Sequence, residues 1–294
     1  MYYNVMVGID GHQGGVDAAT LAHQLAAPSA RFTLVYVTIT APVATHVTNL
    51  ELELADLESL PALMAPELEI CGDRAQAVRV RASSIGAGLE DTAERHDADL
   101  VVVGGSRRHG LTRLISGDDV KSVLHRTRSA VAIAPTGYSE HSARLARIGI
   151  AFDERPTSLV ALAHGGLLAE QLHGDLRVFG VVEPRYYPVG ASMAPILFDD
   201  PASELTAARR RYGHVDGLEV QLVYGQRYEE LERFSQQIDL LVCGSRHQGP
   251  AGRLMLGSTS NHLARDARIP LLIAPASDSA AVERWHAHRK ALPV

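Results

Sequence analysis

Two stretches of the chain repeat one order of residues: DLVVVGGSRRHGLTRLISGDDVKSVLHRTRSAVAIAP from Asp99 to Pro135, and DLLVCGSRHQGPAGRLMLGSTSNHLARDARIPLLIAP from Asp239 to Pro275. Each begins with an aspartate and an apolar strand, passes through a loop with Gly, Ser and Arg, and then reaches Arg-Leu, a glycine, a helix and a second apolar strand ending in Ala-Pro. Chance does not plausibly supply this order twice. The two ends lie 140 residues apart, which indicates two copies of one domain in tandem.

The starts of the two copies match more loosely. NVMVGIDG from residue 4 and ARIGIAFDE from residue 146 are both apolar strands that end on an aspartate, Asp10 and Asp153. Between these landmarks apolar runs alternate with helical patterns, which favours a parallel sheet covered on both faces, an α/β doubly wound fold. The predicted strands are Val5–Ile9, Phe32–Thr38, Ala77–Ala82, Leu100–Val103 and Ala130–Ile133, then Ile148–Phe152, Leu176–Val182, Glu219–Val223, Leu240–Cys243 and Leu271–Ile273.

The domain boundaries follow from the repeat. The first domain is expected over residues 1–138 and the second over residues 144–277, joined by the polar stretch TGYSEHS at residues 136–142. The tail, residues 278–294, fits either a helix with Val282, Trp285 and Leu292 inward or a loosely held terminus.

Composition narrows the class of protein. A net charge of -6 argues against general nucleic-acid binding, because affinity for phosphate backbones comes largely from clustered Lys and Arg. No apolar stretch approaches the ~20 residues that cross a bilayer, and no basic, apolar leader opens the chain. Two cysteines, one in an apolar strand, make a disulfide framework improbable. We therefore expect a cytoplasmic protein that binds neither nucleic acid nor membrane.

The loop after the fourth strand of the second copy carries the chemistry, because ligands of parallel α/β sheets bind beyond the carboxyl ends of the strands. It reads GSRHQGPAGRLMLGSTS from Gly244 to Ser260. Glycines and a helix start favour an anion, and Arg246 can donate charge-assisted hydrogen bonds to phosphate. The alternative is that Gly-Ser-Thr-Ser is simply helix-capping sequence. No Gly-Lys-Ser or Gly-Lys-Thr occurs, so this is not a Walker loop.

This loop, between an apolar strand and a helix, resembles the universal stress protein family, and the resemblance covers nearly the whole chain as two copies. ATP-binding members carry G-x2-G-x9-G followed by Ser or Thr. Gly244, Gly257 and Ser258 match the first glycine, the last glycine and the hydroxyl. His247 stands at the second glycine position, with Gly249 two residues later.

The resemblance implies two Rossmann-like domains, each a five-stranded parallel sheet of order 3-2-1-4-5. It implies adenine and ribose contacts near Asp153 and a backbone contact to adenine near Val181. The phosphates are expected against Gly257, Ser258 and Thr259, as ATP with or without Mg²⁺.

The first copy departs further from this motif. Asp118 and Asp119 stand at its helix start, where the second copy has Ser258 and Thr259. Carboxylates repel a triphosphate at such range, so we expect no triphosphate in the first copy.

The leading hypothesis is a stress-response protein that binds adenine nucleotide in its second domain and acts as a regulatory or interaction module. A slow ATP hydrolase and an adaptor without nucleotide are the alternatives; no paired base and nucleophile supports the hydrolase. The apolar strands at residues 130–133 and 271–273 are expected to pair the two copies as an intrachain pseudo-dimer. A homodimer is left open.

Overall fold

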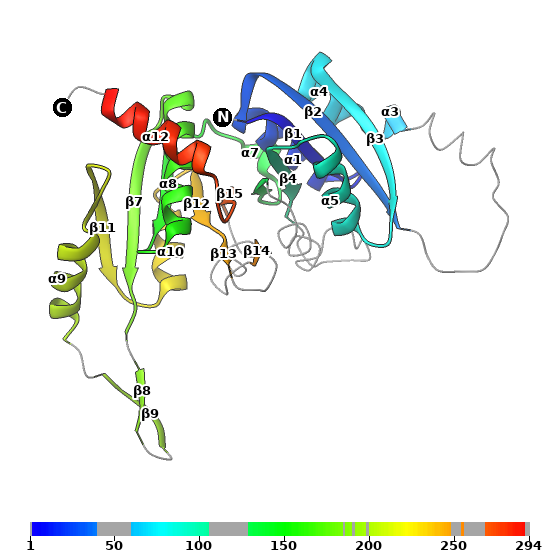
Figure 1. The fold of residues 1–294 in the computed structure, drawn as a ribbon. Helices are drawn as coiled ribbons and strands as arrows, with labels where there is room; N and C mark the ends of the chain where they lie inside the picture. Colours follow the sequence, from blue (N-terminus) through cyan, green and yellow to red (C-terminus); the bar gives the residue numbers. More distant parts are fainter. Residues whose placement is uncertain are drawn as a thin grey trace. The chain divides into compact units, whose positions relative to one another are not determined.

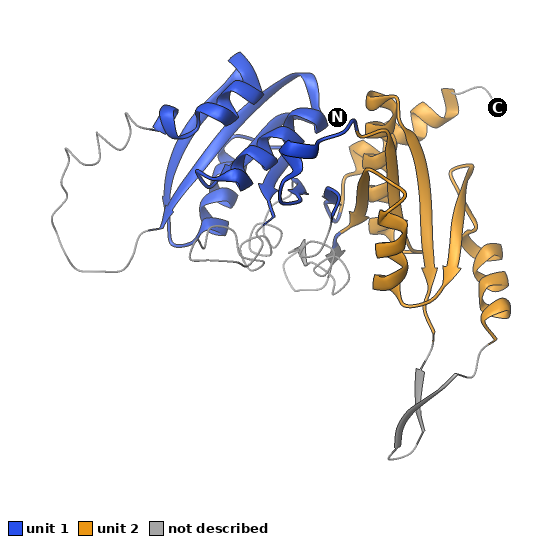
Figure 2. Cartoon of the chain, turned by 180° about the vertical axis from the view of Figure 1, so that it is seen from behind, with its two compact units in different colours: residues 1–144, 245–276 blue, residues 145–244, 277–294 orange. Residues whose placement is uncertain are grey.

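The computed structural model describes residues 2–39, 60–105, 129–184, 186–189, 192–197, 200–247, 254–255 and 268–291 (Figure 1). The chain forms two compact units (Figure 2). Unit 1 contains Met1–Arg144 and Ser245–Ala276, and unit 2 contains Leu145–Gly244 and Ser277–Val294. The units therefore do not follow the repeat boundaries, since the last part of the second copy groups with unit 1.

Unit 1 alternates strands and helices along the first copy. Its elements are β1 (Tyr2–Ile9), α1 (Gln13–Leu25), β2 (Ala26–Ile39), α3 (Leu60–Leu63), α4 (Ala65–Cys71), the 3₁₀ helix η1 (Gly72–Arg74), β3 (Ala75–Ala82), α5 (Ile85–Arg95), β4 (Leu100–Gly104), β5 (Ala130–Ala134) and α7 (Tyr138–His141). The second copy adds the short hairpin β13 (Arg246–His247) and β14 (Leu254–Met255), and the strand β15 (Leu271–Ala274).

The sheet of unit 1 has the expected strand order. Its parallel strands run β3-β2-β1-β4-β5, which is 3-2-1-4-5. α1 and α4 pack together, and α5 covers β2 and β3 from the opposite face, as right-handed crossovers require. β15 joins the edge of this sheet antiparallel to β5, with Leu271 opposite Ile133. The predicted pairing of these two apolar strands is therefore present.

Unit 2 carries most of the second copy. Its elements are β6 (Arg147–Phe152), α8 (Pro156–Leu172), β7 (Asp175–Val182), β8 (Tyr186–Val189), β9 (Ser192–Leu197), α9 (Pro201–Tyr212), β10 (His214–Val215), β11 (Leu218–Tyr224), α10 (Arg227–Ser235), β12 (Leu240–Gly244) and α12 (Ser279–Ala291). The order β11-β7-β6-β12 repeats the 3-2-1-4 part of the first copy. β10 extends the edge through a tight turn at Asp216 and Gly217, whose φ values of 49° and 75° suit an Asp-Gly hairpin.

The aspartate that opens each repeat ties the fourth strand of its copy to the first. Asp99 accepts hydrogen bonds from the backbone amides of Tyr3 (2.7 Å) and Asn4 (3.1 Å). Asp239 accepts from the backbone amides of Ala146 (3.1 Å) and Arg147 (2.8 Å). These side chains therefore hold the two central strands in register at their amino ends.

The tail forms α12, which packs against α8. Trp285 is buried, and its indole nitrogen donates to Asp216 Oδ2 at 3.0 Å. Of the two alternatives for the tail, the helix is the one found. Val282 is only partly buried, and Leu292 lies outside the described residues.

The polar stretch after β5 is anchored rather than free. Buried Asp17 of α1 accepts hydrogen bonds from the amides of Gly137 (2.8 Å) and Ser139 (2.9 Å) and from the Ser139 hydroxyl (2.7 Å). The linker therefore belongs to the fold of unit 1.

Candidate functional site

In each copy the first strand lies between the second and the fourth, and its carboxyl end is the point where the strand order reverses. Open α/β sheets bind ligands at such a switch point. Asp10 follows β1 and Asp153 follows β6 at these two positions. The structure therefore places both aspartates where a ligand is expected.

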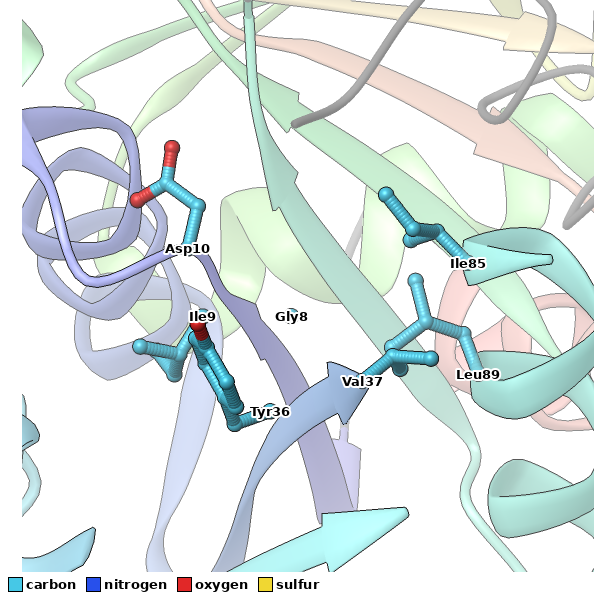
Figure 3. Close-up of a pocket in the computed structure, with 7 residues that line it drawn as sticks. All are labelled: Gly8, Ile9, Asp10, Tyr36, Val37, Ile85 and Leu89. Carbon is cyan, nitrogen blue, oxygen red and sulfur yellow. The ribbon is translucent and has the colours of Figure 1, made fainter. Parts of the chain in front are cut away.

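A pocket lies at the switch point of the first copy (Figure 3). It is small, with a volume of about 10 Å³, about the room that one water molecule needs. The carboxylate of Asp10 lies across the pocket from Ile85 and Leu89 of α5. The lining residues are Gly8, Ile9, Asp10, Tyr36, Val37, Ile85 and Leu89.

Strand register relates this pocket to the site predicted in the second copy. Ile9 pairs with Tyr36 in the first copy, and Phe152 pairs with Gly180 in the second. Val37, which lines the pocket, is therefore the counterpart of the predicted Val181, which is half-buried at the end of β7. The pocket has no sequence motif of its own, although the match of Asp10 to Asp153 indicates this position.

Asp10 is held by its own loop and faces a second carboxyl group. Its Oδ1 accepts from the amides of His12 (2.9 Å) and Gly15 (3.0 Å). A Cβ at Gly15 would lie 2.6 Å from Glu67 Oε1 and 3.3 Å from Asp10 Oδ1, so this glycine lets the two side chains approach. Glu67 is 2% exposed, and burial, with Asp10 adding to it, raises the pKa of its carboxyl group.

Asp153 has polar and cationic neighbours instead. Its Oδ1 accepts from the hydroxyl of Ser158 at 2.6 Å and from the amide of Arg155 at 3.1 Å, and its Oδ2 lies 3.7 Å from Arg155 Nε. The Ser158 hydroxyl accepts from the Asp153 amide at 3.1 Å. The bond from the Arg155 amide closes an Asx turn just before α8, whose N-cap residue, Arg155, makes no side-chain capping bond. The Asp153 side chain stays 35% exposed.

The rim of the second-copy site carries further charged and aromatic groups. Arg211 pairs with Glu154 at 3.2 Å, and Arg227, at the start of α10, pairs with Glu183 at 2.6 Å. Burial raises the pKa of the Tyr212 phenol, and the carboxylates of Glu154 and Asp153 raise it further, while Arg211 opposes them. These residues carry no motif in the sequence, because nothing along the chain shows that α9 ends beside β6.

The first glycine of the motif has a packing role. A Cβ at Gly244 would lie 2.5 Å from the carbonyl oxygen of Thr157, and one at Gly104 in the first copy 2.3 Å from that of Gly14. A side chain at either position would therefore push the first helix away from the end of the fourth strand. The adjacent Ser245 is buried, and its hydroxyl has no hydrogen-bond partner among the described residues.

The rest of the predicted phosphate loop is described only in part. Arg246 and His247 form β13, paired with Met255 and Leu254 of β14. His247 therefore has extended backbone, so a histidine at the second glycine position is not strained. Four of the predicted residues lie outside the described part of the chain: Gly249, Gly257, Ser258 and Thr259.

Among the described residues, no group of three or more His, Cys, Asp and Glu side chains is arranged to hold a metal ion. Within the same residues, no helix has both the length and the apolar character needed to cross a bilayer.

Comparison with known proteins places the chain among stress proteins. The sequence profile of the Universal stress protein family matches residues 1–135 and 145–275. Universal stress proteins of Mycobacterium tuberculosis and Mycobacterium bovis are 27% identical to it over 202 residues, covering 65% of this chain and 69% of theirs. A universal stress protein from Archaeoglobus fulgidus superposes with a TM-score of 0.65 at 15% identity, covering 93% of this chain and 98% of that chain. A universal stress protein structure from Pseudomonas aeruginosa superposes with a TM-score of 0.59 at 16% identity, covering 98% of this chain and 98% of that chain.

Proposed function

The chain belongs to the universal stress protein family, and from that premise we propose that it is a stress-response protein that binds ATP, with or without Mg²⁺, in its second copy. The nucleotide occupies the switch point beyond β6 and β12. Its binding serves regulation or contact with a partner.

The observation that carries this proposal is the difference between the two strand-end aspartates. Asp10 faces the buried carboxyl group of Glu67, so a phosphate in the first copy would meet like charge. Asp153 lies beside Arg155, and the next residue of its loop is paired with Arg211. Arginine offers the planar donor fork that suits phosphate oxygens. The second copy is therefore the better anion site.

The predicted residues keep distinct roles in this proposal. Asp153 accepts from the ribose or adenine, and the backbone near Val181 contacts adenine. Gly257, Ser258 and Thr259 hold the phosphates, with Arg246 adding charge and Gly249 leaving room for the loop. Gly244 acts indirectly, since its missing side chain lets α8 approach β12.

The first copy is expected to bind no triphosphate. The space at the end of its first strand is only about 10 Å³, about the room that one water molecule needs. The carboxylates of Asp118 and Asp119, at the predicted helix start, also repel phosphate.

Calorimetric titration of the full chain with ATP tests the proposal. The full chain is needed because β15 of the second copy belongs to unit 1. Losing one hydrogen bond to a charged group costs about 1.5 to 3 kcal/mol, so Ser258→Ala should weaken ATP binding by about ten- to a hundredfold. Asp153→Asn should also weaken it, whereas the matched Asp10→Asn should leave ATP affinity unchanged. No binding by the wild type would favour the adaptor alternative.

A further inference from the structure

The last two residues of α9 hold the two neighbours of Asp153. The rings of Tyr212 and Phe152 lie 6.4 Å apart between centroids, tilted by 45°. The Arg211 guanidinium pairs with Glu154 at 3.2 Å and also lies 5.7 Å from the centroid of the Tyr212 ring. The strand-end aspartate is thus flanked on both sides by contacts from one helix end, which we name the α9 clasp: Arg211 and Tyr212.

The loop held by the clasp is itself ordered by hydrogen bonds. The amides of Asp153, Arg155 and Ser158 donate within residues 153–158, to the Ser158 hydroxyl (3.1 Å), Asp153 Oδ1 (3.1 Å) and the Arg155 carbonyl (3.0 Å). These bonds fix the direction of the Asp153 carboxylate. Because both flanking residues contact α9, movement of that helix end would displace the loop and its carboxylate together.

Within the described residues of the first copy, the corresponding helix end has different side chains. This helix, α4, ends in Ile70 and Cys71 before Gly72, where α9 ends in Arg211 and Tyr212 before Gly213. An aliphatic side chain and a thiol supply neither an ion pair nor an aromatic ring. The difference between the copies therefore lies in the crossover helix as well as in the phosphate loop.

We propose that the α9 clasp positions Asp153 for the nucleoside part of the ligand, so that α9 and nucleotide binding are coupled. Arg211 and Tyr212 are positioning residues, since they act through Glu154 and Phe152. The inference rests on the proposed function for its ligand, but the ordering of the loop is measurable without one.

The experiment is a charge exchange on the full chain. Arg211→Glu and Glu154→Arg should each weaken ATP binding about three- to tenfold, since an exposed ion pair is modest and reversal adds repulsion. The double variant should return to within about twofold of the wild type. Tyr212→Phe should keep the affinity and Tyr212→Ala should lower it. Arg210→Glu is the matched control, because it makes the same change on the preceding exposed residue of α9.

Amide hydrogen exchange of residues 153–158 in the ligand-free chain tests whether the α9 clasp orders the Asp153 loop, independently of whether the chain binds ATP. Arg211→Glu should speed exchange there, and the double variant should restore protection. If Arg211→Glu matches Arg210→Glu in exchange, or if the double variant does not recover, the positioning role is wrong. If the wild type binds no ATP while the exchange pattern holds, the proposed function fails and the clasp remains as the element that orders the Asp153 loop.

Discussion

At the scale of single residues, the two aspartates that open the repeats have the same backbone partners but different electrostatics. Burial raises the pKa of Asp99 more than the amides of Tyr3 and Asn4 lower it. Burial also acts on Asp239, but hydrogen bonds from the Arg147 side chain and backbone outweigh it and lower its pKa. Two differences account for this: Asp99 is the more deeply buried of the two, and Arg147 adds side-chain hydrogen bonds to Asp239 where Asn4 gives Asp99 only its backbone amide.

Asp239→Asn should therefore make the protein less stable at neutral pH, by about 1 to 3 kcal/mol for a charged hydrogen-bonded group. A carboxyl group with a lowered folded pKa stabilises above its unfolded value of 3.8 and loses this as pH falls through the folded value. Urea unfolding from pH 7 to pH 3 should show wild type and variant converging in acid. Asp175→Asn, at an exposed residue at the start of β7, is the control. A difference in unfolding free energy between wild type and Asp239→Asn that stays constant with pH would contradict the lowered pKa of Asp239.

Glu67→Gln should change the unfolding free energy in the opposite direction, making the protein more stable at neutral pH. Burial and Asp10 raise the pKa of Glu67, and its Oε2 has no hydrogen-bond partner among the described residues. The ionised form therefore costs stability, a cost absent at low pH and growing as pH rises through the unfolded and then the folded pKa. Glu67→Gln should raise the unfolding free energy at pH 8 by on the order of 1 kcal/mol and have little effect near pH 4. Glu69→Gln, exposed on the same helix, should do neither.

At the scale of elements, α8 shows why a helix keeps two adjacent glycines despite their cost in a helix interior. A Cβ at Gly165 would lie 2.1 Å from Ile150 Cδ1, on the sheet side, and one at Gly166 2.4 Å from the ring of Trp285, on the α12 side. α8 is packed closely on both sides. The same geometry explains why the polar tail forms a docked helix.

Gly166→Ala should therefore destabilise the protein by about 1 to 3 kcal/mol, as overpacking does. It should also shift the fluorescence of Trp285, the only tryptophan, toward the exposed value. In a Trp285→Ala background the same change should instead stabilise by about 0.5 to 1 kcal/mol, because alanine is the better helix former. Thermal unfolding of the wild type, Gly166→Ala, Trp285→Ala and the double variant measures both changes in stability. If Gly166→Ala changes stability in the same direction with and without Trp285, the indole ring is not what the added methyl group meets.

The repeat made much of the fold predictable at this scale. Apolar runs bounded by aspartates and Ala-Pro located the central strands, because strands buried on both faces are continuously apolar. β2 begins earlier than expected, at Ala26, because its polar first half, with Pro28, Ser29 and Arg31, carries no apolar signal. The tail remained ambiguous because its burial depends on Gly166, more than a hundred residues earlier.

At the scale of the whole molecule, the repeat predicted two copies, and the structure groups β15 of the second copy with the sheet of the first. Short apolar edge strands favour such pairing, since an exposed edge has unpaired backbone groups. The positions of Asp153 and Val181 at strand ends were predictable, because both follow from the apolar runs of the strands. The contacts of Arg211, Tyr212 and Glu67 were not, because they depend on where crossover helices end in space.

The central claim, one ATP site per chain in the second copy, is tested most directly by native mass spectrometry of the full chain with ATP, with and without Mg²⁺. The account predicts one ATP per chain in the wild type and in Asp10→Asn, and none retained in a variant combining Asp153→Asn with Ser258→Ala. Two ATP per chain, or one that persists in the combined variant and disappears in Asp10→Asn, would place the site in the first copy and contradict the account.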